Sequence, residues 1–157
     1  ASSLSLQWLG LNNNSLSSLD KKSIGREYFS PNEYKQFYKT GFKTIDTILL
    51  KIFEKNKLRA YITYTYLIEM QKMFQKSFAI LKEKGYFIMV IGNNTIAGYE
   101  FMTYKYLIEI AEKIGFSTEL VLIDDIKSRG LMTKRNKTAS VISREYIVIF
   151  SKDANEK

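Results

Sequence analysis

The stretch that decides the fold is Lys84-Gly-Tyr-Phe-Ile-Met-Val-Ile-Gly-Asn-Asn-Thr95. Residues 86–91 are apolar without alternation, which is typical of a strand covered on both faces, as in a parallel sheet. Lys84 and Gly85 break the helical pattern that precedes this strand, and Gly92 with the two asparagines ends it. We therefore expect a buried strand between two helices.

On both sides of this stretch, apolar residues recur at intervals of three and four, as in amphipathic helices. The spacing predicts helices over 42–53, 60–82 and 98–114, and two more strands over 118–126 and 143–150. A strand, a helix and a strand in this order imply a right-handed parallel crossover, and the last two strands could pair antiparallel. The expected fold class is α/β, a partial Rossmann-like sheet with helices on both faces and a terminal antiparallel hairpin. We expect residues 1–40 to form an irregular or helical segment and residues 41–157 to form the α/β domain.

The composition of the chain excludes several classes of function and favours one kind of partner. The chain has 157 residues, with 24 Lys and Arg against 16 Asp and Glu, so its formal charge is +8, which favours nucleic acid over a membrane surface. Cysteine and histidine are absent, which excludes disulfides, thiolate metal sites and Ser-His-Asp catalysis. No apolar run approaches the roughly 18 residues of a membrane span, and the N-terminal stretch has no signal-type core. We expect a cytoplasmic protein with no metal site and no membrane partner.

The most basic stretch lies between the last two predicted strands. Residues 127–137 carry five basic side chains, no acid and one glycine. Long loops in compact domains are usually functional or disordered, and the apolar residues in and after this stretch argue against disorder. We expect it to contact nucleic-acid phosphates, although its cations could instead pair with Asp124, Asp125 or Glu145. The candidate nucleic-acid-binding residues are Lys127, Arg129, Gly130, Lys134, Arg135, Asn136 and Lys137.

Asn93 and Asn94 are candidate cleft-lining residues. They follow the first strand at its carboxyl end, where open α/β sheets place their ligands. Their amides could donate to and accept from a base edge or a cofactor. The alternative is a simple turn, because Asn and Gly tolerate left-handed backbone. Tyr61, Tyr64 and Tyr66, with Arg59, could stack unpaired bases; the alternative is that Tyr64 is a core residue and the others lie on an amphipathic surface.

Four stretches of the chain match one pattern: residues 2–10, 81–92, 106–116, and 128–136 with 143–150. Together they resemble the C-terminal half of a class I S-adenosylmethionine-dependent DNA methyltransferase, of the kind that methylates the N4 amine of cytosine or the N6 amine of adenine. In this resemblance the first strand is the family's fifth strand, and the basic stretch belongs to its closing hairpin. Glu83 and Lys84 replace the usual proline and first glycine of the turn before that strand.

The resemblance implies methyl transfer from S-adenosylmethionine to an exocyclic base amine, with DNA as a partner, as in restriction-modification. The family's glycine-rich cofactor loop and Pro-Pro catalytic turn have no counterpart, because this sequence has one proline and no Gly-x-Gly. The chain would then begin just downstream of the catalytic turn, as a fragment or a subunit of a split enzyme. We assign no catalytic residue, place the cofactor site mainly in the missing N-terminal half, and expect no activity from this chain alone.

The resemblance also implies a protein partner, either that N-terminal half or another copy of the chain. Two alternatives remain open, since fold does not settle substrate. One is a non-enzymatic basic nucleic-acid-binding module, and the other is half of an RNA methyltransferase.

Overall fold

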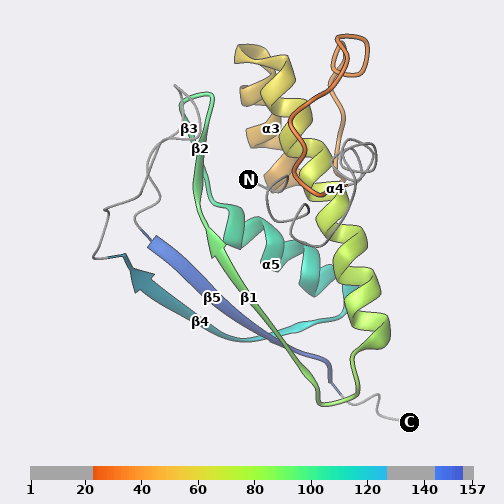
Figure 1. The fold of residues 1–157 in the computed structure, drawn as a ribbon, viewed down its shortest axis with the longest axis vertical. Helices are drawn as coiled ribbons and strands as arrows, with labels where there is room; N and C mark the ends of the chain where they lie inside the picture. Colours follow the sequence, from red (N-terminus) through yellow and green to blue (C-terminus); the bar gives the residue numbers. More distant parts are fainter. Residues whose placement is uncertain (1–22, 127–143, 154–157) are drawn as a thin grey trace, which may run out of the picture.

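A computed structural model describes residues 23–126 and 144–153 (Figure 1). The three helices described are α3 (Lys43–Lys55), α4 (Lys57–Ile80) and α5 (Thr103–Ile114). The five strands described are β1 (Tyr86–Gly92), β2 (Asn94–Ile96), β3 (Tyr99–Phe101), β4 (Ser117–Asp125) and β5 (Arg144–Ser151). The predicted helices over 42–53 and 60–82 and the three predicted strands are thus confirmed to within a few residues.

Strands β1, β5 and β4 form a three-stranded sheet in that order. β5 runs antiparallel to both neighbours, so the expected antiparallel pairing of the last two strands is confirmed. β1 and β4 are parallel to each other, with α5 between them in the chain. They are not adjacent, because β5 lies between them. The parallel orientation of β1 and β4 agrees with the predicted crossover, whereas every directly hydrogen-bonded strand pair in the described residues is antiparallel.

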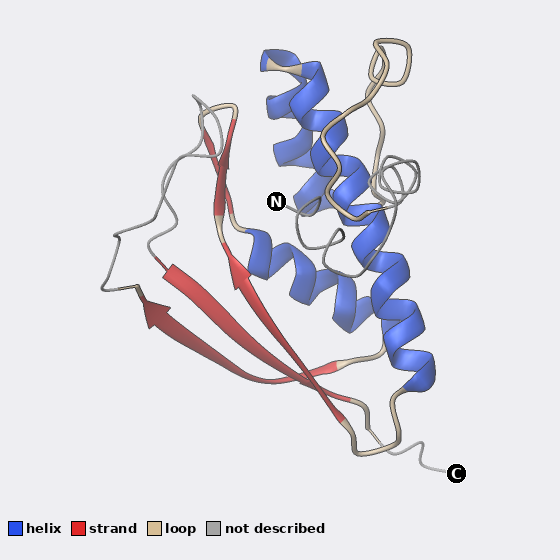
Figure 2. Ribbon diagram, viewed as in Figure 1, coloured by secondary structure: helices blue, strands red, loops and turns tan. Residues whose placement is uncertain are grey.

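Among the described residues, the helices lie on one side of the sheet only (Figure 2). β1 alternates accordingly: Met89 and Ile91 pack toward the helices, whereas Ile88 and Val90 are 60% and 59% exposed. The expectation of helices on both faces is thus wrong for this part of the chain. The unbroken apolar run predicted cover on both faces, because both faces of β1 are apolar, although helices cover only one of them.

The uncovered side of the sheet is a continuous apolar surface. Register places Ile149 beside Ile88 and Leu120, and Ile147 beside Val90 and Leu122. Paired residues of neighbouring strands point to the same face of a sheet. We call this surface the open face. It comprises Tyr86, Ile88, Val90, Leu120, Leu122, Ile147 and Ile149.

The covered side holds an aromatic core. Phe74 of α4 is fully buried, and its ring lies 6.0, 6.0 and 5.8 Å from the rings of Phe87, Phe116 and Phe150. All three contacts are edge-to-face, which suits the ring quadrupoles. These contacts fasten α4 to the amino end of β1, to the residue before β4 and to the carboxyl end of β5.

A hairpin, β2–β3, stands where the sequence predicted the start of a helix. Its two-residue turn is Ala97-Gly98, with φ of 51° and 85°. Positive φ at both positions defines the hairpin turn that Asn-Gly usually occupies. Because alanine is rare in this conformation, the sequence lacked the usual signal, and α5 begins at Thr103 instead of Gly98.

Candidate functional site

The candidate site lies at the carboxyl end of β1, where the chain leaves the sheet. Gly92, the last residue of β1, pairs with Glu145 of β5, and Asp124 of β4 pairs with the same Glu145. The end of β1, the end of β4 and the start of β5 therefore meet at one edge of the sheet (Figure 1). We call this the carboxyl edge. The basic stretch predicted to bind nucleic acid joins β4 to β5 at this same edge.

Asn93 is half-buried at the carboxyl edge, and its amide contacts Tyr146. Its Nδ2 donates to the Tyr146 hydroxyl at 3.5 Å, which is a long hydrogen bond. Its Oδ1 is buried and has no hydrogen-bond partner among the described residues. A buried acceptor without a donor is unusual in native proteins and calls for an explanation. Asn93 therefore offers an acceptor that an N–H group could satisfy.

The tyrosine that this amide contacts is itself stacked on a second tyrosine. The Tyr146 ring, buried on the helix side of β5, stacks on Tyr104 in the first turn of α5, with centroids 3.8 Å apart and planes 6° from parallel. The stack joins β5, the middle strand of the sheet, to α5. The sequence reasoning missed both tyrosines, because Tyr146 sits in a uniformly apolar run and Tyr104 fell inside a predicted helix.

Asn94 has a different role in the structure. It begins β2, and its side-chain Oδ1 accepts the backbone N–H of Thr95 at 2.8 Å. Neither asparagine has a positive φ; the described non-glycine residues that do are Lys84 and Ala97. The left-handed turn considered as the alternative is therefore wrong in its backbone. The amide of Asn94 serves the local backbone, and that of Asn93 faces Tyr146.

The predicted nucleic-acid contacts, Lys127, Arg129, Gly130, Lys134, Arg135, Asn136 and Lys137, lie outside the described residues. Their flanking strands are described. Asp125 and Arg144 are opposite each other, and the Arg144 Nε donates to the Asp125 Oδ1 at 2.5 Å. The hydrogen bond to Asp125 and its negative charge raise the pKa of Arg144. In the structure, the acid at the end of β4 is thus neutralised by Arg144.

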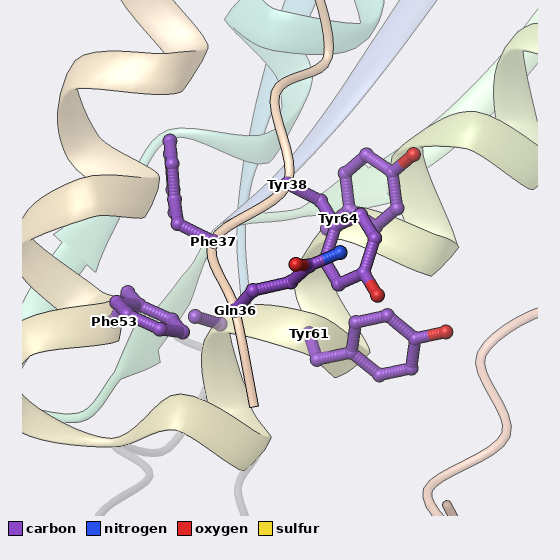
Figure 3. A pocket seen from close by; sticks show the side chains of 7 residues that line it. Gln36, Phe37, Tyr38, Phe53, Tyr61 and Tyr64 are labelled. Carbon is purple, nitrogen blue, oxygen red and sulfur yellow. The ribbon is translucent and has the colours of Figure 1, made fainter. Parts of the chain in front are cut away.

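A second cluster of aromatic residues lies along α4, away from the carboxyl edge. The ring of Tyr64 stacks on Tyr38 and on Tyr61 at 5.3 and 6.1 Å. Figure 3 shows these three tyrosines on one side of a pocket and Phe37 with Phe53 on the other. The cavity measures ≈ 10 Å³, which is room for about one water molecule. Because the rings stack on one another and the cavity is so small, the described geometry leaves no space for a base between them.

Arg59, the cation proposed to join that cluster, is already paired. Its Nη1 lies 3.2 Å from Oε2 of Glu27. Burial raises the pKa of Tyr61, with smaller contributions from Glu33 and neighbouring tyrosines. These contacts describe a packed structural cluster that fastens residues 26–38 to α4.

The described residues have neither a metal cluster nor a membrane-spanning helix. They contain no group of three or more acidic residues placed to hold a metal ion. None of their helices is both long enough and apolar enough to cross a bilayer.

Comparison with known proteins gives distant likenesses only. No family model and no curated protein matches the chain. Three crystal structures of one candidate DNA modification methylase from Thermus thermophilus are similar to it at 17%, 17% and 19% identity, with TM-scores of 0.45, 0.46 and 0.47. The matches cover 59%, 64% and 66% of this chain, and one of the three structures is complexed with S-adenosyl-L-methionine.

The chain spans only 38%, 42% and 43% of the length of those solved structures. At this identity and TM-score the likeness describes a partial similarity of fold. Activity, substrate and cofactor therefore have to be argued from the residues of this chain.

Proposed function

We propose that this chain is the C-terminal half of a DNA methyltransferase that transfers a methyl group from S-adenosylmethionine to the N4 amine of cytosine or the N6 amine of adenine. The observation that carries the proposal is the meeting of two features at the carboxyl edge. Asn93 with its unsatisfied acceptor lies there, and β4 and β5 lead into the basic stretch there. That stretch is also the part of the sequence that resembles the closing hairpin of this family most specifically.

In this proposal the chain supplies the wall of the cleft and a grip on the DNA backbone. Asn93 borders the cleft, and its Oδ1 is available to an N–H of the substrate or of the missing half. The cations of the basic stretch contact phosphates, which position the enzyme without reading sequence. The target base leaves the stack to reach the cleft, as in other enzymes that modify a base inside a duplex. The cofactor site and the catalytic turn lie in the N-terminal half.

The uncovered surfaces of the sheet support the view that a partner is missing. β1 is an edge strand of the described sheet, and its sequence has no charge or proline to block further pairing. The open face is apolar, with Tyr86 65% and Ile88 60% exposed. Soluble monomers rarely expose contiguous apolar patches beyond a few hundred Å². We propose that the N-terminal half covers the edge and the open face, and that in its absence copies of this chain associate.

A methyl-transfer assay tests whether the cofactor site and the catalytic turn lie in the N-terminal half. The chain alone, with tritiated S-adenosylmethionine and duplex DNA, should give no labelled DNA. The same chain co-expressed with the polypeptide encoded directly upstream should label it. Tight cofactor binding and methyl transfer by the chain alone would contradict the proposal that the cofactor half is missing.

DNA binding tests the role of the basic stretch. We expect the chain to bind duplex DNA with a strong salt dependence, in which each phosphate contact contributes about 0.9 to the slope of log K against log salt. Replacing Arg129, Lys134 and Arg135 by serine should reduce that slope by about 2–3. Equal slopes for the variant and the wild type would remove the basic stretch from the interface. Tighter binding to structured RNA than to duplex DNA would instead favour the RNA methyltransferase alternative.

A further inference from the structure

The described cations divide sharply by residue type. All three described arginines are ion-paired: Arg26 with Glu69 at 2.6 Å, Arg59 with Glu27 at 3.2 Å, and Arg144 with Asp125 at 2.5 Å. In the same part of the chain, no lysine ammonium lies within 4.0 Å of a carboxylate, because these three pairs are the salt bridges found there. The net positive charge of the described structure is therefore presented by its lysines.

Three of these lysines lie within 6.0 Å of aromatic rings, one on the β2–β3 hairpin, one on α3 and one on α5. The ammonium of Lys55, in the last turn of α3, lies 5.3 Å from the ring of Tyr99 on the hairpin. Lys57, which begins α4, lies 5.4 Å from the ring of Phe53. Lys105, in the first turn of α5, is 6.0 Å from the ring of Tyr104.

The β2–β3 hairpin spans the distance between these elements. Figure 1 shows its base beside the start of α5 and the carboxyl edge, and its tip toward the α3–α4 junction at the top of the view, above the ends of β4 and β5. Lys55, Lys57 and Lys105 are all exposed. The exposed acids closest in sequence, Glu54 and Glu100, form no salt bridge with them. The three charges are thus not neutralised by a carboxylate.

Contact with an aromatic ring prepares a lysine for an anion. The ring attracts the ammonium and restricts the lysine side chain before the anion binds. Less rotamer entropy is therefore lost when the anion binds. Because the ring carries no net charge, the ammonium keeps its full charge for a partner. Such cations suit the phosphates of a nucleic-acid backbone, which bind through charge and release counterions.

We propose that Lys55, Lys57 and Lys105 form a second phosphate-contacting surface, which extends the DNA interface from the basic stretch across the hairpin to the α3–α4 junction. This inference rests on the proposed function, since it takes the DNA as already bound at the carboxyl edge. The surface contacts the sugar-phosphate backbone, so it adds affinity and register without base preference.

The test compares two triple variants of the full chain that carry the same charge change. The first replaces Lys55, Lys57 and Lys105 by methionine, which keeps an apolar stem on each ring. The control replaces Lys72, Lys76 and Lys82, exposed lysines in the second half of α4 and just beyond its end, by methionine. Binding to a fluorescein-labelled duplex of about three helical turns is measured by anisotropy at several salt concentrations, and circular dichroism confirms that each variant is folded.

We expect the first variant to lower the salt slope by about 2–3 and the control to leave it nearly unchanged, because screening in about 0.1 M salt removes charge effects beyond about 10 Å. Equal slopes for the first variant and the wild type would overturn the inference. Equal reductions in both variants would also overturn it, since net charge alone would then explain the effect.

The proposed function has a separate failure in the same experiment. A wild-type chain that does not bind the duplex at any salt concentration refutes DNA binding itself. A wild-type chain whose binding depends on the basic stretch but not on Lys55, Lys57 and Lys105 refutes only this extension of the interface.

Discussion

Replacing Lys152 by methionine should destabilise the fold, because this side chain ties the exit of the sheet to the end of α4. Its Nζ donates to the backbone oxygens of Phe78 at 2.9 Å and Leu81 at 3.0 Å, and it lies 4.7 Å from the Phe78 ring. Those oxygens belong to the last turn of α4 and to its C-cap. Lys152 therefore satisfies carbonyl groups that have no partner within the helix.

The magnitude follows from three contributions that methionine removes. A cation at a helix C-terminus contributes about 0.3–1 kcal/mol, and its contact with an aromatic ring about 0.5–1 kcal/mol at an exposed site. The net contribution of a hydrogen bond is about 0.5–1.5 kcal/mol, and water can replace part of it at this half-exposed position. Because these contributions overlap, we expect a loss of about 2 kcal/mol, which for a chain of this size lowers Tm by about 4–8 °C.

Urea unfolding followed by circular dichroism measures this loss, with Lys82→Met as the matched control. Lys82 is exposed and lies just beyond the C-cap of α4, so the control removes the same charge near the same helix end. We expect the control to change the free energy of unfolding by less than about 0.5 kcal/mol. If the two variants lose the same stability, the contacts of Lys152 contribute nothing beyond their general charge effect.

Three further outcomes are expected. Replacing Val90 by lysine puts a charge in the open face without disturbing the core, so it should reduce self-association in sedimentation velocity; a wild-type chain that is strictly monomeric at high concentration would contradict this. Burial raises the pKa of Tyr61, so the folded state favours its neutral form. The stability that this provides is complete below about pH 10 and is lost as pH rises through the folded-state pKa. The urea midpoint of Tyr61→Phe should therefore fall less than that of the wild type between about pH 9 and pH 12. Gly115→Ala should lower Tm more than Gly41→Ala. Both glycines have positive φ, of 122° and 91°, but a Cβ at Gly115 would lie 3.1 Å from the Phe78 ring, whereas a Cβ at Gly41 would meet open space. Equal losses of Tm would show that backbone strain alone decides the cost.

Much of the secondary structure was readable from local patterns. The helices α3 and α4 followed from apolar spacing, and the glycine after α5 marked its end, with Gly115 at φ of 122°. Asn56 ends α3, and it also caps α4, because its side chain accepts the backbone N–H of Arg59 at 2.9 Å. These features depend on neighbours within a few residues, so the sequence contains their causes.

The arrangement of the sheet was not readable in the same way. The run 86–91 is apolar on both sides, and an apolar residue looks the same whether a helix or nothing covers it. The insertion of β5 between β1 and β4 depends on pairing between segments far apart in the chain, such as Gly92 with Glu145. The hairpin was hidden because its turn uses alanine in a conformation that usually needs asparagine or glycine.

The chemical groups that this chain can use are already visible in its residues: an excess of cations, no histidine or cysteine, a basic stretch, and asparagines after a strand. Which of these groups lie close together depends on the folded structure. It brought Asn93 to Tyr146, and it neutralised the described arginines while leaving lysines without carboxylate partners around the hairpin. The physical reason is that composition sets the charges and donors, whereas long-range strand pairing and helix packing set the distances between them.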